Sequence, residues 1–126
     1  MVELTVNEKR RRCQQLPVLD YNTPIIKTHG DVEPNCIGFS PDYSDDIRAW
    51  MHAMYALELV DGNYIKNVEA VRDKKVSEMS MNEILTMMTY HLRGERFCDG
   101  LIAGAMENGY LPELSLRLRE ITTCVE

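Results

Sequence analysis

The segment 91–100 gathers side chains that can bind a phosphate and a nucleobase. Those with a basic nitrogen or an aromatic ring are His91, Arg93, Arg96 and Phe97. Guanidinium groups are permanently charged and donate forked hydrogen bonds to phosphate oxygens. An aromatic ring offers a stacking face for a base, worth about 1–3 kcal/mol per base. The segment therefore indicates a site for a small, negatively charged molecule that contains a base.

Two further polar residues and a glycine extend this candidate site. Asp99 and Asn108 can bind ribose hydroxyls or the amino group of a base, and Gly100 lets a ligand or a helix approach the backbone closely. We expect a helix to begin near residues 95–96, so that its free N–H groups and positive dipole end face a phosphate near Gly94. The predicted ligand-binding residues are His91, Arg93, Arg96, Phe97, Asp99, Gly100 and Asn108.

The same residues also have a structural interpretation. Phe97 can be a core residue, because a lone aromatic in a helix usually buries itself. Arg96 and Asp99 are three residues apart and can form a surface ion pair of little energetic weight. His91 can be a hydrogen-bonded structural residue, and Cys98 a small buried hydrophobe. The exposure of Phe97 and the positions of the arginines distinguish the two interpretations.

The sequence has no motif typical of a metal site or of a nucleophile with its base. Its cysteines and histidines are widely spaced, at Cys13, Cys36, Cys98, Cys124, His29, His52 and His91. Zinc-binding domains instead bring Cys and His together in closely spaced pairs. We therefore predict reduced thiols, no metal, no other cofactor and no catalytic residues.

Length, charge and hydropathy narrow the class of protein. A chain of 126 residues with 44% hydrophobic and 27% charged residues is typical of one globular domain. A formal net charge of −6 disfavours a long nucleic acid partner, whose affinity depends on phosphate neutralisation. Neither a run of 18 apolar residues nor a secretion signal is evident, so we expect a cytoplasmic protein without a membrane partner.

The N-terminal part of the sequence differs from the rest. Residues 2–16 predict a short arm or a weak helix, and the charge run at 10–12 can be solvated or can reach an anion or a partner chain. Residues 17–40 hold three of the five prolines, with short apolar runs between turn-forming residues. This pattern predicts two or three short strands, which would form a small antiparallel sheet.

The remaining sequence has a helical period. Apolar residues of the segment 42–59 recur at three- and four-residue steps, and Ser40 or Ser44 can cap this helix. Ser80 and Glu83 match a capping box. The predicted helices cover residues 42–59, 64–73, 81–94, 95–108 and 112–121, with Gly94 ending or bending the third and Gly109 closing the fourth.

These elements predict one mainly α domain of the α+β type. Residues 1–126 form this single domain, with the arm and short strands in residues 1–40 and the helical core in residues 41–126. Short connections between the last helices favour an αα-hairpin. The predicted architecture is a helical bundle with a small N-terminal antiparallel sheet or arm.

The segment 91–100 also resembles a known signature. Its run Arg-Phe-Cys-Asp-Gly at 96–100, followed by Glu-Asn-Gly at 107–109, is similar to that of an uncharacterised bacterial and phage domain family. A weaker resemblance extends upstream to the aromatic-rich segment 43–64. Small phage proteins of this layout resemble the Thoeris anti-defence family called anti-defence one. Its members bind cyclic ADP-ribose isomers, and some homologues bind cyclic oligonucleotides.

This resemblance implies a function that agrees with the residues of the segment. It implies a phage-type sponge in the host bacterial cytoplasm that sequesters a cyclic nucleotide immune signal without cleaving it. A homo-oligomer, dimeric or higher, would close two chains around each ligand. One alternative is an enzyme acting on ADP-ribose or a related nucleotide, with His91 and either Asp99 or Glu95 as acid and base. Another is a protein-binding adaptor that inhibits a host immune complex.

Overall fold

Helices dominate the part of the chain that the structure describes. The structure is a computed structural model, and it describes residues 5–26, 43–98 and 100–123. Its helices are α1 (Val6–Gln15), α2 (Asp45–Ala56), α3 (Tyr64–Val71), the 3-10 helix η1 (Val76–Glu78), α4 (Met81–Gly94), α5 (Leu101–Glu107) and α6 (Tyr110–Thr123). No helix in these ranges is long and apolar enough to cross a bilayer.

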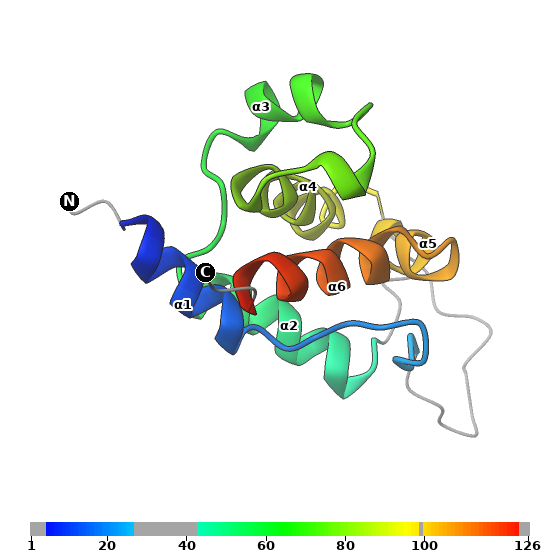
Figure 1. Cartoon of the computed structure of the whole chain (residues 1–126). Helices are drawn as coiled ribbons and strands as arrows, with labels where there is room; N and C mark the ends of the chain where they lie inside the picture. Colours follow the sequence, from blue (N-terminus) through cyan, green and yellow to red (C-terminus); the bar gives the residue numbers. More distant parts are fainter. Residues whose placement is uncertain (1–4, 27–42, 99, 124–126) are drawn as a thin grey trace.

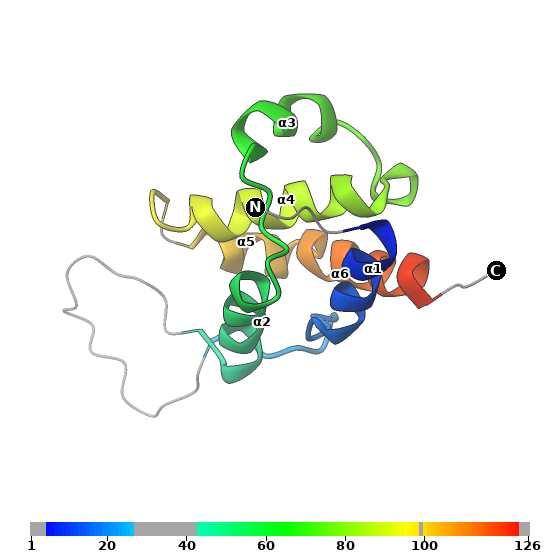
Figure 2. The ribbon, with the colours of Figure 1, turned by 90° about the vertical axis from the view of Figure 1, so that its left-hand side faces the viewer.

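The helices stack in successive layers, with α4 and α6 at the centre. α4 packs against α3 on one side and against α6 on the other, and α1 packs on α6 (Figure 1). The quarter-turned view in Figure 2 shows the same order, with α2 on the side of α6 away from α4. The fully buried side chains between these layers include Trp50, Ile84, Met88, Leu111 and Leu114. The core is therefore continuous from α2 through α6 to α4.

Local sequence signals explain where the central helices begin. The Ser44 hydroxyl accepts a hydrogen bond from the Ile47 N–H at the start of α2, and Ile47, Trp50 and Met54 form its buried stripe. Ser80 and Glu83 form the predicted capping box of α4, with bonds of 3.2 and 2.9 Å. The predictions for α2, α3 and α4 are thus confirmed.

The predicted N-terminal sheet is not seen in the part of that segment that the structure describes. Of the two alternatives predicted for residues 2–16, the helix is the one that forms, over Val6–Gln15, and Thr5 caps it by accepting a bond from the Glu8 N–H. Among residues 17–26 there is no strand, and Ile26 forms only an isolated bridge with Tyr43. Proline lacks the N–H that a sheet ladder needs, which disfavours strands in this part of the chain. Residues 27–40 of that prediction lie outside the described residues.

Side-chain bonds to backbone carbonyls join α1 to its neighbours. Arg12 donates to the Leu57 carbonyl (2.9 Å) and to the Glu58 carboxylate (3.0 Å), beyond the end of α2. Gln14 donates to the Thr122 carbonyl on α6 over 2.6 Å. One member of the predicted charge run, Arg12, is therefore structural.

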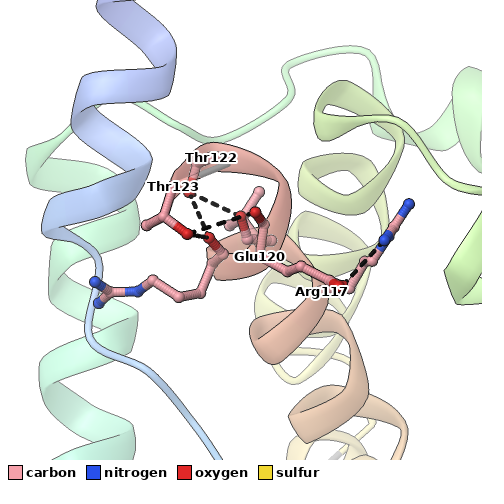
Figure 3. Close-up of polar contacts among 6 residues, drawn as sticks. Arg117, Glu120, Thr122 and Thr123 are labelled. Atoms are coloured by element: carbon pink, nitrogen blue, oxygen red, sulfur yellow. Dashed lines mark hydrogen bonds and ion pairs between the residues drawn. The ribbon is translucent and has the colours of Figure 1, made fainter. Parts of the chain in front are cut away.

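Several polar side chains in the C-terminal turns of α6 bond within the helix. Figure 3 shows the ion pair between Arg117 and Glu120, whose closest atoms are 3.0 Å apart. The Thr122 and Thr123 hydroxyls donate to carbonyls one turn earlier, over 2.8 and 2.7 Å. These side chains therefore serve the helix itself.

The capping box of α4 should contribute to the stability of the protein. Replacing Ser80 by Ala should lower the free energy of unfolding by about 1 kcal/mol, because the Glu83 N–H loses its partner at the start of a central helix. Urea denaturation followed by far-UV circular dichroism measures this change. The exposed Ser77 accepts no cap bond in η1, so Ser77→Ala is the matched control. Equal losses in the two variants would contradict the capping role.

Candidate functional site

The connection between α4 and α5 is a closed turn that bonds back onto α4. The Arg96 N–H donates to the Arg93 carbonyl, and the N–H groups of Phe97 and Cys98 both donate to the Gly94 carbonyl. Gly94 lies close to α5, because a Cβ at this position would be 2.6 Å from the Leu101 Cδ2 atom and would require that side chain to move. The backbone N–H groups of residues 96–98 are therefore already used by the protein.

The Glu95 side chain caps the start of α5. Its carboxylate accepts from the Gly100 N–H and from the Ile102 N–H, each over 2.8 Å. It also accepts from the Tyr43 hydroxyl (2.9 Å), whose oxygen in turn accepts from the Ala103 N–H over 3.0 Å. The carboxylate therefore occupies the place at the helix N-terminus where an external anion would otherwise bind.

The predicted helix start near residues 95–96, with a phosphate near Gly94, is thus wrong. α5 begins at Leu101, and its first N–H groups are satisfied by Glu95 and Tyr43. Glu95 is therefore a helix cap in this structure, a role that differs from the acid or base that the enzyme alternative assigns to it. A glutamate shortly before a helix is a signal for such a cap, but the contribution of Tyr43 comes from far away in the sequence.

Aromatic and cationic side chains surround this turn at the surface. Phe97 is 85% exposed, so the core interpretation of this residue is wrong, and Arg96 beside it is also exposed. The Arg93 guanidinium lies over the Tyr64 ring of α3, 5.9 Å from its centroid. Tyr90, one turn before Arg93 on α4, is 37% exposed. We call Tyr64, Tyr90, Arg93, Arg96 and Phe97 the junction surface.

The other predicted site residues have different surroundings. His91 is buried, with its ring between Tyr90 and Tyr110. Gly100 adopts a left-handed φ of +91° and donates its N–H to Glu95. Asn108, at the far end of α5, caps α6 by accepting from the Tyr110 N–H over 2.8 Å. Asp99 lies outside the described residues. The structure thus brings Arg93, Arg96, Phe97 and Gly100 to one junction, whereas His91 is buried against Tyr90 and Asn108 lies at the far end of α5.

Burial fixes the protonation state of His91. Desolvation lowers the pKa of His91, and the opposing effect of its hydrogen bond to the Met87 carbonyl is smaller, so the pKa lies below its ordinary value. Since a carbonyl only accepts, the Nδ1 atom 2.9 Å away carries the proton. His91 is therefore neutral at physiological pH.

Metal ligands do not gather in the described residues. In residues 5–26, 43–98 and 100–123, no group of three His, Cys, Asp or Glu side chains could hold a metal ion. Cys98, in the turn between α4 and α5, is exposed, and Cys13 is buried in the core. Burial raises the pKa of the Cys13 thiol to about 11, so this thiol stays protonated.

Comparison with known proteins places the chain among sequences of unknown role. Residues 21–123 match a family described as a family of unknown function, DUF6508. No curated protein and no solved structure matches the chain. The prediction that the chain belongs to an uncharacterised family is confirmed. The Arg-Phe-Cys-Asp-Gly signature and the similarity to phage sponges stay predictions.

The Glu95 cap should be needed for a stable junction. Glu95→Ala removes the acceptor for two backbone donors, and we expect the free energy of unfolding to fall by about 1–3 kcal/mol. Amide hydrogen exchange should accelerate most at Gly100 and Ile102, because their N–H groups lose this partner. Glu107→Ala, at an exposed position in the last turn of α5, is the control. Unchanged protection of both amides in Glu95→Ala would show that the cap is dispensable.

His91 should make stability depend on pH. Its pKa is lowered in the folded state, so the unfolded chain binds this proton first, near its ordinary pKa of about 6.5. The free energy of unfolding should therefore fall as the pH decreases below about 6.5 toward the folded pKa. Denaturation curves between pH 7.5 and 5 measure this slope.

Two variants assign that slope to its residue. His91→Phe keeps a ring between Tyr90 and Tyr110 but does not titrate, so the slope should flatten. His52→Gln, at an exposed position on α2, should retain the wild-type slope. A wild-type slope in His91→Phe would assign the effect to other groups.

Proposed function

Since this chain belongs to the DUF6508 family, whose function is unknown, we propose from its own structure that it is a non-catalytic binding protein for a small anionic nucleotide. The binding site is the junction surface at the end of α4. The observation that carries this proposal is the exposure of Phe97, 85%, on a turn whose backbone is held by hydrogen bonds. Burying a large aromatic side chain contributes about 1.5–3 kcal/mol of free energy relative to leaving it in water. A ligand that covers the ring can recover this free energy.

The junction surface supplies both kinds of contact that a nucleotide needs. Phe97 offers a ring for base stacking, and Arg96 is an exposed cation beside it. Arg93 is half-buried over Tyr64, a contact that limits the conformations of its guanidinium group. The anion would be bound by guanidinium side chains rather than by helix N–H groups, because Glu95 already satisfies those of α5.

The hydrogen bonds of the turn favour binding over catalysis. The fixed backbone of residues 94–98 is pre-organised, so a ligand need not order it. His91 is buried and neutral, and Glu95 accepts three hydrogen bonds. These are two of the three residues to which the enzyme alternative assigns the acid and base roles. Both side chains are thus engaged with other groups of the protein, which favours structural roles for them.

The proposed function also includes a particular ligand and a particular assembly of the protein. The ligand is a cyclic nucleotide immune signal, a cyclic ADP-ribose isomer or a cyclic oligonucleotide, which the protein sequesters intact as an anti-defence sponge. Tight sites bury most of a small ligand, about 70–90% of its surface. An exposed ring on a surface turn cannot achieve this alone. Two copies of the chain would therefore face each other across the ligand.

Titration calorimetry tests this function. We expect heat with a cyclic ADP-ribose isomer or a cyclic dinucleotide, and Phe97→Ala should weaken binding about 5- to 150-fold, as expected for one lost stacking contact. Arg96→Ala should weaken binding and reduce its salt dependence. Recovery of the ligand after heat denaturation should return it unchanged.

The controls for this test come from other faces of the protein. Tyr55→Ala removes an exposed aromatic ring from α2, and Arg119→Ala removes an exposed cation from α6. Both variants should bind as tightly as the wild type. Absence of heat with all the cyclic nucleotides would overturn the proposal, and release of a cleaved product would favour the enzyme.

An adaptor function is the second candidate, and the same surface favours it. Aromatic residues and arginine are enriched among the residues that dominate protein interfaces, and Phe97 and Arg96 form such a pair. An adaptor would retain its protein partner in the absence of any nucleotide. Affinity capture with wild type and with the Phe97→Ala, Arg96→Ala double variant separates the two functions. The adaptor would be favoured if the wild type captures a stoichiometric protein partner, the double variant does not, and nucleotides give no heat in calorimetry.

A further inference from the structure

A cleft of about 670 Å³ lies at the opposite end of α4 from the junction surface. It is bounded by the first turns of α1, by the connection between α2 and α3, and by the first turns of α4. Residues 58–63 form one side, and Val6 and Lys9 of α1 form another. α1 precedes residues 21–123, which match the family. The lining residues Thr5, Val6 and Lys9 therefore lie outside the family match.

A hydrogen-bonded network along the cleft joins a cation to an anion. The Lys9 ammonium donates to the Asn82 side-chain oxygen over 2.9 Å. The Thr86 hydroxyl lies within 3.0 Å of the Asn82 carbonyl and 2.6 Å of the Asp61 carboxylate. Asn67 donates to that same carboxylate over 3.0 Å. Lys9 and Asp61 thus mark a positive and a negative end of one polar network.

Asp61 keeps its negative charge in this environment. Partial burial raises the pKa of Asp61, but three hydrogen bonds and the charge of Lys9 outweigh it and leave that pKa below its ordinary value. The nearby Glu58 carboxylate is paired at 3.0 Å with Arg12, which also lies 3.5 Å from Glu8 and therefore offsets part of the Glu58 charge. A simple anion would be repelled by Asp61, and a simple cation by Lys9.

The remaining lining is suited to an apolar group of modest size. Val6 is 63% exposed, and Met81 is half-buried beside the polar network. Leu85 contributes a buried apolar side chain one turn further along α4. Covering such groups contributes about 25 cal/mol for each Å² of apolar surface removed from water. The cleft therefore presents two opposite charges and an apolar wall together.

We propose that this cleft binds a small zwitterion, namely a free α-amino acid with an apolar side chain. The carboxylate of the ligand lies against Lys9, the ammonium group lies toward Asp61, and the side chain covers Val6 and Met81. Opposite charges on a ligand match opposite charges on the protein, which gives specificity against molecules with only one of them. This site shares no residue with the junction surface and does not depend on the function proposed for it.

Nuclear magnetic resonance titration with L-leucine tests the site directly in the wild-type protein. Amide resonances of Lys9, Asn63 and Asn82 should shift in a saturable way. N-acetyl-leucine lacks the ammonium charge and leucinamide lacks the carboxylate, so each should bind at least tenfold more weakly. No saturable shift with leucine, or equal binding of the three compounds, would overturn the proposal.

Variants locate the site. Lys9→Met keeps the length and apolar stem of the side chain but removes its charge, and it should weaken leucine binding at least tenfold. Lys66→Met, at an exposed position on α3, is the matched control and should bind normally. Phe97→Ala should also leave leucine binding unchanged, which keeps this test independent of the junction surface. Binding that survives Lys9→Met would contradict the assignment of the carboxylate.

Discussion

The carboxylate of Glu95 is the interaction on which the junction between α4 and α5 depends. It satisfies two N–H groups at the start of α5 and accepts from Tyr43, which precedes α2. A helix start leaves N–H groups without partners, and a buried or half-buried start needs acceptors for them. By supplying that acceptor, Glu95 joins three parts of the chain and fixes the course of the turn.

The Glu95 cap determines what kind of anion site the protein can offer. A helix N-terminus attracts an external phosphate when its N–H groups are free, and here those of Gly100 and Ile102 are not. Arginine side chains are left to bind an anion. Such contacts at the surface are screened by salt, so shape and stacking at Phe97 would have to supply much of the specificity.

α4 connects two surfaces of different chemistry through one buried core. Along its length it contributes Ile84, Met88 and Leu92 to the interior, between α3 and α6. Its first turns line the cleft with Lys9 and Asp61, and its last turn carries Arg93 toward Tyr64. Close packing makes such a helix a rigid support, so each end presents its side chains in a defined arrangement.

Short-range patterns in the sequence determined much of the helical architecture. The capping box of Ser80 and Glu83, the buried stripe of α2 and the left-handed Gly109 before α6 each involve residues within one or two helical turns. The end of α4 at Gly94 was also predicted. These features depend on local backbone geometry, so neighbouring residues are sufficient to specify them.

The candidate site was only partly predictable. Its location at the end of α4 followed from residue types, but the continuous helix predicted for residues 95–108 was wrong, because α5 begins only at Leu101. The exposure of Phe97, the burial of His91 and the contact of Arg93 with Tyr64 were not evident from spacing. Only the tertiary structure decided these features. The partners of Glu95 and Arg93 include Tyr43 and Tyr64, which are distant in sequence and come into contact with Glu95 and Arg93 only when the helices pack.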